Sequence, residues 1–194
     1  FKESRDSNNK NPDGQYRRCP PEGGNLTFVM GSPDGELKYP DEAEPRPAEK
    51  DRDPDEQPHA VTLTPYWLRK FVVTNSEYEL FDVAHKKLRD DNYSKGDDQP
   101  VVDVKWWEAV MYCRWLGAGY RLPTEAEWEA GCRAGARKPT TFWFGNKEEE
   151  LGQHAWFSGN SKNRTHTLAE GEEPSHANPW GLYDMAGNVW EWCS

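Results

Sequence analysis

The segment spanning residues 181–192 holds the side chains whose types and spacing best suit chemistry. Its carboxylates, Asp184 and Glu191, lie on either side of Gly187-Asn188, a dipeptide that favours a turn. The surrounding residues are mostly apolar, so the turn is expected to be buried and its carbonyls need partners. Carboxylate and carbonyl oxygens are the ligands that hard cations prefer. The segment therefore predicts a cation site, and the alternative is that both carboxylates cap turn amides.

Cysteines and histidines are the other candidates for metal or nucleophilic chemistry. The cysteines show no C-x-x-C spacing, which argues against a zinc site, and they are compatible either with two disulfides or with buried thiols. The histidines show no spacing such as H-x-x-x-H, so they are expected at the surface or in turns. No G-x-S-x-G segment supports a serine triad. These residues are Cys19, Cys113, Cys132 and Cys193, and His59, His85, His154, His166 and His176.

The composition describes an acidic chain of 194 residues, a length that suits one domain. Ten Trp, eight Tyr and seven Phe can build a core although only 35% of the residues are hydrophobic. The 16 glycines and 15 prolines predict many turns and little regular secondary structure. The formal net charge of −10 argues against a nucleic-acid partner, because phosphate binding needs basic clusters. No apolar run is long enough to span a membrane, so no membrane partner is expected.

The N-terminal part of the sequence is expected to be mostly irregular. Residues 1–25 are polar and are interpreted as an exposed arm, which leads into a short apolar strand from Leu26 to Met30. Residues 33–58 form an acidic, Pro-rich loop with ten Asp or Glu against four Lys or Arg. A solvated loop is the favoured interpretation of this stretch, and a cation site or a partner-docking loop is the alternative.

A strand and a helix are expected next along the chain. Val61, Leu63 and Trp67 lie on one face of an extended segment, in the alternation typical of a strand. Thr74 and Glu77 form a capping box, so a helix is expected to begin there. Three residues of this helix recur at helical spacing and should face the core: Tyr78, Phe81 and Ala84.

Two further helices are expected in the middle of the chain. One covers residues 106–116, and the other begins at a second capping box, Thr124 with Glu127, and ends near Gly135. Leu122 precedes the second of these helices and should be extended, because Pro123 follows Leu122. The first of these helices should bury one side, made of Trp106, Ala109, Val110 and Cys113.

Several segments resemble, in the same order, the motifs of the formylglycine-generating enzyme family, also called sulfatase-modifying factors. Together they span residues 26–194, and several motifs in register are far more specific than one. The segments are Phe28-Val-Met-Gly-Ser, Pro58-His-Ala-Val, Val73-Thr-Asn-Ser-Glu-Tyr, Pro100-Val-Val-Asp-Val-Lys-Trp, Ala109-Val-Met-Tyr-Cys-Arg-Trp-Leu, Arg121-Leu-Pro-Thr-Glu-Ala-Glu-Trp-Glu, Asn178-Pro-Trp and the segment 181–192.

The resemblance implies an α+β fold, namely the formylglycine-generating-enzyme variant of the C-type-lectin-like fold. This fold has few short helices, a twisted antiparallel sheet and much irregular structure. We therefore expect a polar arm at 1–25 and a sulfatase-modifying-factor-like domain at 26–194, which is incomplete at its C-terminus by comparison with the family's motifs.

The resemblance also assigns individual residues of the segment 181–192. Trp190 matches a tryptophan on the floor of the family's active site, which makes it a candidate substrate-binding residue, although an apolar setting also suits a core tryptophan. A second family calcium site is not expected here, because Trp156 stands where an Asn ligand is required. The residues that match a structural calcium site of the family are Asp184, Gly187, Val189 and Glu191.

In active members of the family, a copper(I) ion bound by two cysteines oxidises a peptidyl cysteine of a sulfatase to formylglycine with dioxygen. Soft thiolates suit copper(I). The matching positions for these cysteines lie after Ser194, so copper is expected only if the following segment carries the pair, and residues 1–194 alone are predicted to be inactive. Cys113 and Cys132 match cysteines that are disulfide-bonded in secreted members, and buried thiols are the alternative.

Two classes of function follow from the resemblance. The first is a formylglycine-generating-type oxidase with a protein or peptide partner. The second is a non-catalytic binding or display domain of the C-type-lectin-like type, found in retroelement-diversified variable proteins and in sensor or effector modules. A sulfoxide synthase relative is disfavoured, because residues 1–25 are too short for the upstream histidine domain that such enzymes need. The sequence does not indicate a compartment.

Overall fold

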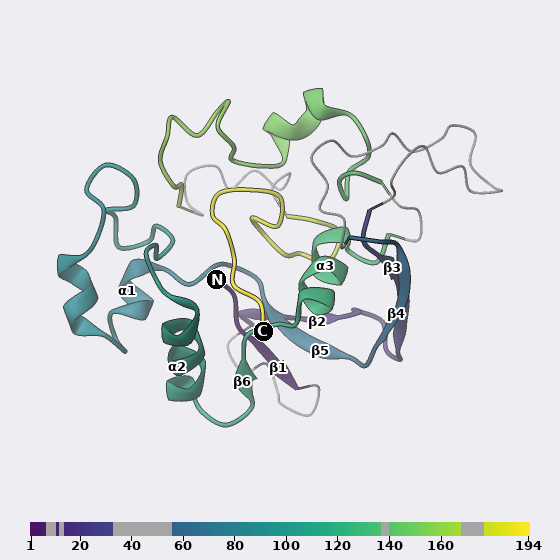
Figure 1. The fold of residues 1–194 in the computed structure, drawn as a ribbon, viewed down its shortest axis with the longest axis horizontal. Helices are drawn as coiled ribbons and strands as arrows, with labels where there is room; N and C mark the ends of the chain where they lie inside the picture. The colour runs from purple at the N-terminus through teal and green to yellow at the C-terminus, as the bar shows by residue number, and fades with distance from the viewer. Residues whose placement is uncertain (7–10, 12–13, 33–55, 137–139, 168–176) are drawn as a thin grey trace.

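The computed structural model describes residues 1–6, 11, 14–32, 56–136, 140–167 and 177–194 (Figure 1). Within these ranges, short strands and helices alternate with long irregular segments. The strands are β1 (Ser4–Asp6), β2 (Tyr16–Cys19), β3 (Leu26–Met30), β4 (His59–Leu63), β5 (Tyr66–Arg69) and β6 (Tyr120–Arg121). The helices are α1 (Asn75–Tyr78), α2 (Trp106–Leu116) and α3 (Glu125–Arg133), with two 3-10 helices, η1 (Val83–Lys87) and η2 (Glu148–Gln153).

The strands form two antiparallel sheets. The larger has the order β2-β5-β1-β6, and β3 pairs with β4 in the smaller one. Few short helices and antiparallel sheets confirm the expected α+β class. The prediction of a single strand across residues 61–67 is wrong. Thr64 and Pro65 separate β4 from β5, and the two strands belong to different sheets.

The N-terminal residues depart most from expectation. Strand β1 lies inside the larger sheet, between β5 and β6, and the Phe1 side chain packs edge-on against Tyr112 in the core, with ring centroids 5.4 Å apart. Residues 1–5 are all buried. The prediction of an exposed arm is therefore wrong for residues 1–5, whose charged side chains have partners inside the protein. For example, Glu3 Oε1 accepts hydrogen bonds from Tyr16 at 2.9 Å and from Arg69 at 3.1 Å.

Both predicted capping boxes are present. The Thr124 hydroxyl accepts from the Glu127 amide at 3.2 Å, and the Glu127 carboxylate accepts from the Thr124 amide at 2.8 Å. Thr74 opens α1 in the same way. However, α1 ends at Tyr78, and a separate 3-10 helix follows. Ala84 is exposed in that helix rather than in the core, so its predicted orientation is wrong.

Helix α2 has the predicted bounds, but not entirely the predicted orientation. Ala109 and Cys113 are buried as expected, whereas the Trp106 side chain is almost half exposed. Helix α3 ends at Arg133, because Ala134 adopts a left-handed conformation with φ 50° and Gly135 follows with φ 67°. This agrees with an end near Gly135.

Two hydrophobic clusters support the fold. One joins Phe1 and Val73 to the inner face of α2, and the other joins Leu68 of β5 to Leu182 and Met185 of the C-terminal segment. The final residues run between α2 and α3 in Figure 1, where the two termini also lie near each other. The C-terminal segment thus contacts most parts of the fold.

No helix in the described ranges is long and apolar enough to cross a membrane. Of the acidic loop at residues 33–58, only 56–58 belong to the described ranges, and residues 33–55 lie outside them.

Candidate functional site

The predicted turn at Gly187-Asn188 is present and is held tightly by a neighbouring loop. The Asn188 amide donates to the Trp156 carbonyl at 2.8 Å. Its side chain forms two hydrogen bonds of 2.9 Å with the backbone of His166. A Cβ atom at Gly187 would lie 2.2 Å from the Trp156 carbonyl oxygen, far inside van der Waals contact. Glycine at position 187 therefore allows the close approach on which the turn depends.

The same loop contains a stacked pair of rings. Trp156 and His166 lie with centroids 3.7 Å apart and planes 9° apart. His166 is buried, and its Nε2 lies 2.8 Å from the Ser161 carbonyl oxygen. His85 is also buried, so the expectation of surface or turn histidines is wrong for these two residues. His176 lies outside the described residues.

A buried ion pair fixes the other end of the segment 181–192. Lys2 Nζ lies 2.6 Å from Glu191 Oε1, and both side chains are excluded from solvent. Removing two charges from water is costly, so the pair must retain its mutual attraction to be tolerated. Sequence analysis missed Lys2 entirely, because nothing in a polar N-terminal stretch indicates a partner 189 residues away.

The predicted cation ligands can be tested against this geometry. Glu191 Oε2 is buried without a hydrogen-bond partner, which is the environment in which a carboxylate oxygen gains most from a hard cation. Asp184 is also buried and has φ 57°. The Gly187 carbonyl accepts from the Val189 amide at 2.9 Å and retains one lone pair. Oxygen donors of this kind suit a hard cation, although Glu191 also pairs with the Lys2 ammonium, and calcium at these four residues stays a prediction.

Two tryptophans connect the C-terminal segment to α2 through reciprocal hydrogen bonds. The Trp192 indole donates to the Val104 carbonyl at 2.7 Å, and the Trp106 indole donates to the Cys193 carbonyl at 2.8 Å. The Ser194 amide then donates to the Pro123 carbonyl at 2.9 Å. These bonds fix the backbone that follows Trp190, whereas the turn at Gly187-Asn188 fixes the backbone that precedes it.

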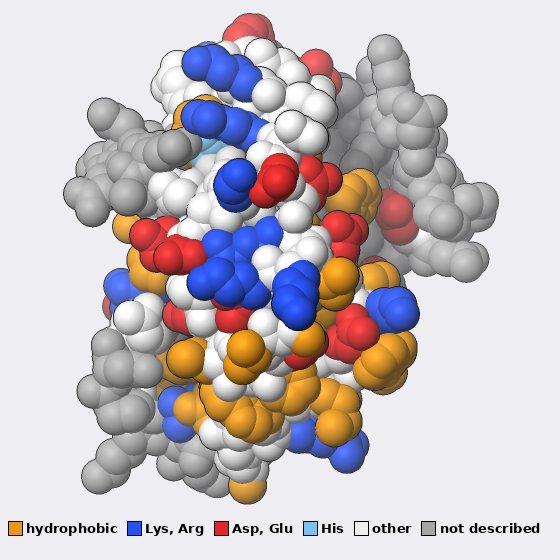
Figure 2. Space-filling model, turned by 90° about the vertical axis from the view of Figure 1, so that its left-hand side faces the viewer, with side chains coloured by type: hydrophobic (Ala, Val, Ile, Leu, Met, Phe, Trp, Pro, Cys, Tyr) orange, Lys and Arg blue, Asp and Glu red, His pale blue; other side chains and the backbone are white. Residues whose placement is uncertain are grey.

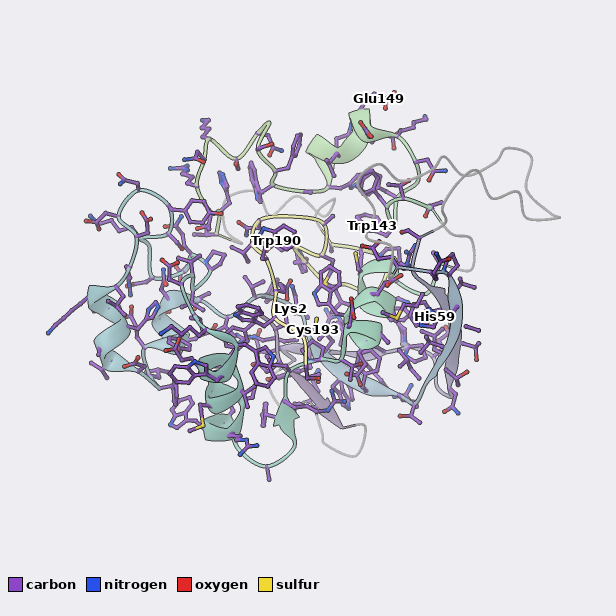
Figure 3. The ribbon with its side chains drawn as sticks, viewed as in Figure 1. Lys2, His59, Trp143, Glu149, Trp190 and Cys193 are labelled. Atoms are coloured by element: carbon purple, nitrogen blue, oxygen red, sulfur yellow. The ribbon has the colours of Figure 1, made fainter. Side chains whose placement is uncertain are left out.

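Trp190 itself is fully exposed, so a core role for this residue is wrong. Figure 3 shows its place in the C-terminal segment, above Lys2 and Cys193. It borders an open groove of about 520 Å³ beside the segment that leads into α2. The groove is lined by Phe1, Tyr93, residues 101–105, Val189, Trp190 and Trp192. A large aromatic surface on a fixed backbone beside a groove can pack against an extended peptide.

Comparison with known proteins identifies the family. The model of the sulfatase-modifying factor enzyme 1-like domain matches residues 22–194. The chain belongs to this family.

The relatives of this sulfatase-modifying-factor domain include active and inactive proteins. The formylglycine-generating enzyme of Mus musculus is 38% identical over 142 residues, covering 70% of this chain and 35% of that protein. The inactive C-alpha-formylglycine-generating enzyme 2 of Bos taurus is 41% identical over 98 residues, covering 48% of this chain and 32% of that protein. This chain therefore spans about a third of the length of these relatives.

Among solved structures, the crystal structure of CarF matches 89% of this chain and 80% of its own chain, with 19% identity and a TM-score of 0.49. We base no functional assignment on this likeness.

The four cysteines of the sulfatase-modifying-factor domain form no disulfide with one another. Disulfides from Cys113 and Cys132 to partners after Ser194, which the resemblance implies for secreted members, stay a prediction. Burial raises the pKa of each of the four thiols to about 12, which leaves little thiolate at neutral pH. Cys132 also donates to the Met185 carbonyl at 3.1 Å. The described residues contain no group of three or more His, Cys, Asp or Glu side chains that could hold a metal ion. Because copper(I) binds thiolates, the raised pKa of the four thiols disfavours them as its ligands.

Proposed function

We propose that this domain is part of a formylglycine-generating-type oxidase that acts on a peptidyl cysteine of a sulfatase. The family match across residues 22–194 and the identity to a formylglycine-generating enzyme support the class. The single structural observation that carries the proposal is the exposed Trp190 beside an open groove.

Trp190 is proposed to bind the substrate peptide. Its neighbours on both sides are fixed, by the Asn188 bonds to the loop 156–166 and by the Trp192 bond to Val104. The indole can therefore meet a peptide without first ordering its own backbone, which lowers the entropic cost of binding. Residues 101–105 line the same groove and supply apolar contacts, the Asp103 carboxylate and the Lys105 ammonium group.

Copper is proposed to bind outside residues 1–194, since none of the four thiols described above suits it. Two thiolates from the segment after Ser194 would hold copper(I), consistent with the ligand preference of that ion. When bound, copper supplies the activation of dioxygen. The residues described here contribute peptide binding and a fixed backbone next to the groove, and no chemical step is assigned to them.

Calcium is proposed as a structural ion at the turn. The carboxylates of Asp184 and Glu191 and the carbonyls of Gly187 and Val189 would hold it. Hard oxygen donors suit calcium, and its contribution is to the stability of the segment that presents Trp190.

The proposal is tested with the full-length protein that contains residues 1–194. Incubation with copper(I), dioxygen and a Cys-x-Pro-x-Arg peptide should convert the cysteine to formylglycine, as read by mass spectrometry. Trp190→Ala should raise KM by about tenfold, the loss expected when one aromatic contact is removed. Val29→Thr, which removes an exposed apolar side chain on β3, is the control and should leave KM unchanged.

A full-length protein that binds the peptide but never converts it, with copper present, would contradict the oxidase and leave a binding domain. Conversion by residues 1–194 alone would show that the copper site has been misplaced.

A further inference from the structure

Helix α2 carries a stripe of large apolar side chains on its outer face. Trp107, Met111 and Trp115 are 56%, 50% and 48% exposed, although all three are large hydrophobic residues. They are spaced four residues apart, so they share one side of the helix. The opposite side packs in the core through Ala109, Tyr112 and Cys113. The exposed stripe is therefore a separate side of α2 from the one that packs in the core.

The apolar surface extends to the segment that packs beside α2. The Phe81 and Trp115 rings lie 5.9 Å apart, and Leu80 and Val83, on either side of Phe81 in the sequence, are each more than two-thirds exposed. Figure 2, which faces this side of the molecule, shows hydrophobic side chains gathered over the lower part, with Lys and Arg side chains directly above. Contiguous exposed apolar surface of this kind marks interaction sites in soluble proteins.

Exposed cations lie on α2 and on the segment that packs beside it. Arg114 is exposed on α2, and Lys86 and Lys87 are exposed at the end of η1. In the described part of the chain, neither lysine side chain forms an ion pair. The carboxylates nearest in the sequence have other partners, although Asp82 and Glu108 keep their charge: Glu79 pairs with Arg89, Asp82 accepts from the Ala84 amide, and Glu108 accepts from the Lys105 amide. We refer to Lys86, Lys87 and Arg114, three exposed cations on a chain of net charge −10, as the basic rim.

We propose that this face of α2 docks an acidic, amphipathic segment of a partner protein. Apolar side chains of the partner would pack on Trp107, Met111 and Trp115, and its carboxylates would meet Lys86, Lys87 and Arg114. Tryptophan, methionine and arginine are enriched at the centres of protein interfaces. The proposal stands independently of the oxidase proposed above, because it uses none of the residues of the Trp190 groove.

Two other occupants fit the charges less well. A symmetric contact between two copies would place the same basic rim on both sides, so like charges would face each other. An anionic membrane would repel the net negative chain as a whole, whereas a short acidic segment meets only the local basic rim.

The test uses the whole chain and a synthetic helical peptide with Leu along one face and Glu beside it. Binding measured by fluorescence anisotropy should be saturable and should weaken with added salt. Met111→Glu should weaken it by at least about tenfold, as should the pair Lys86→Glu and Lys87→Glu. Val29→Thr, at an exposed position on β3, is the matched control and should leave binding unchanged. Each variant changes an exposed side chain, and an unchanged melting temperature verifies that it is folded.

Three results would overturn the proposal. The first is no saturable binding of the acidic peptide, or equal binding of a version with Lys in place of Glu. The second is sedimentation with phosphatidylserine vesicles that Met111→Glu abolishes, which would make lipid the occupant. The third is a dimer that Met111→Glu dissociates, which would make a second copy the occupant.

Discussion

Two pairs of tryptophans, Trp190 with Trp192 and Trp106 with Trp107, lie where the C-terminal segment passes α2. In each pair, the two residues have different roles. Trp192 and Trp106 donate their indole N–H groups to backbone carbonyls of the opposite segment. Among the described residues, Trp190 and Trp107 form no such bond, and each is the more exposed member of its pair. In both pairs, therefore, one tryptophan anchors the backbone and the other presents an aromatic surface.

The two pairs differ in what holds the presented side chain. Trp107 projects from a regular helix, whose own hydrogen bonds fix the backbone. Trp190 lies in an irregular segment. There the backbone is fixed by contacts of Asn188, Glu191 and Trp192 with distant parts of the chain. An irregular site therefore depends on anchors that a helical site does not need, and loss of those anchors should affect Trp190 far more than Trp107.

The largest effect is expected at the Lys2–Glu191 pair. Glu191→Gln leaves a buried ammonium without its partner and should lower the free energy of unfolding by about 3–5 kcal/mol. Replacing both residues, as Lys2→Met with Glu191→Leu, should restore most of that loss, because no charge remains to be desolvated. Urea denaturation of the three proteins measures this, with a chelator present because Glu191 is also a proposed calcium ligand. Equal losses in the single and double variants would mean that the pair does not anchor the segment.

Calcium removal should have the next largest effect. If the ion is present at 100 times its dissociation constant, its binding adds about 2.7 kcal/mol to stability. A chelator should then lower the melting temperature of the unmodified protein, and Asp184→Asn should remove that sensitivity. A melting temperature that does not respond to chelator would leave Asp184 and Glu191 as residues bonded only to protein groups.

The indole hydrogen bonds should contribute less. Trp192→Phe and Trp106→Phe each remove one donor and should each cost about 1 kcal/mol. Both bonds cross the same junction, so a double-mutant cycle should show coupling between them. Strict additivity in that cycle would show that the two tryptophans anchor the segment independently.

The presented tryptophan should contribute least to stability. Trp190→Ala removes a fully exposed side chain, and the free energy of unfolding should change by less than about 0.5 kcal/mol. Thermal melting measures this, alongside the KM change proposed above. A loss as large as that of Trp192→Phe would contradict the division between anchoring and presenting residues.

The parts of the fold that could be predicted from sequence are those set by neighbouring residues. The two capping boxes place the threonine hydroxyl and the glutamate carboxylate within one helical turn, so Thr74 and Thr124 mark their helix starts correctly. The bounds of α2 and β3 also follow from local pattern. The Gly187-Asn188 turn was found in the same way, together with the family motif around it.

The parts that could not be predicted depend on distant partners. Residues 2–5 are polar in sequence and buried in the structure, where Glu3 bonds to Tyr16 and Arg69, and Lys2 bonds to Glu191. Trp106 was placed on the buried side of its helix from the helical spacing, and a core role was the alternative for Trp190. Tertiary packing decides which of these side chains faces solvent, and the local sequence does not show it. The stacking of Trp156 on His166 has no local signal either.

The sequence separation of the anchors has a consequence for the order of folding. The indole bonds join residues 87 and 88 positions apart, and the Lys2–Glu191 contact closes a loop of 189 residues. Contacts that close long loops are entropically expensive and form late. The capping boxes and helices can form early, while the Lys2 ammonium has no partner until residue 191 has been made. During synthesis Lys2 is thus expected to stay solvated until Glu191 is available.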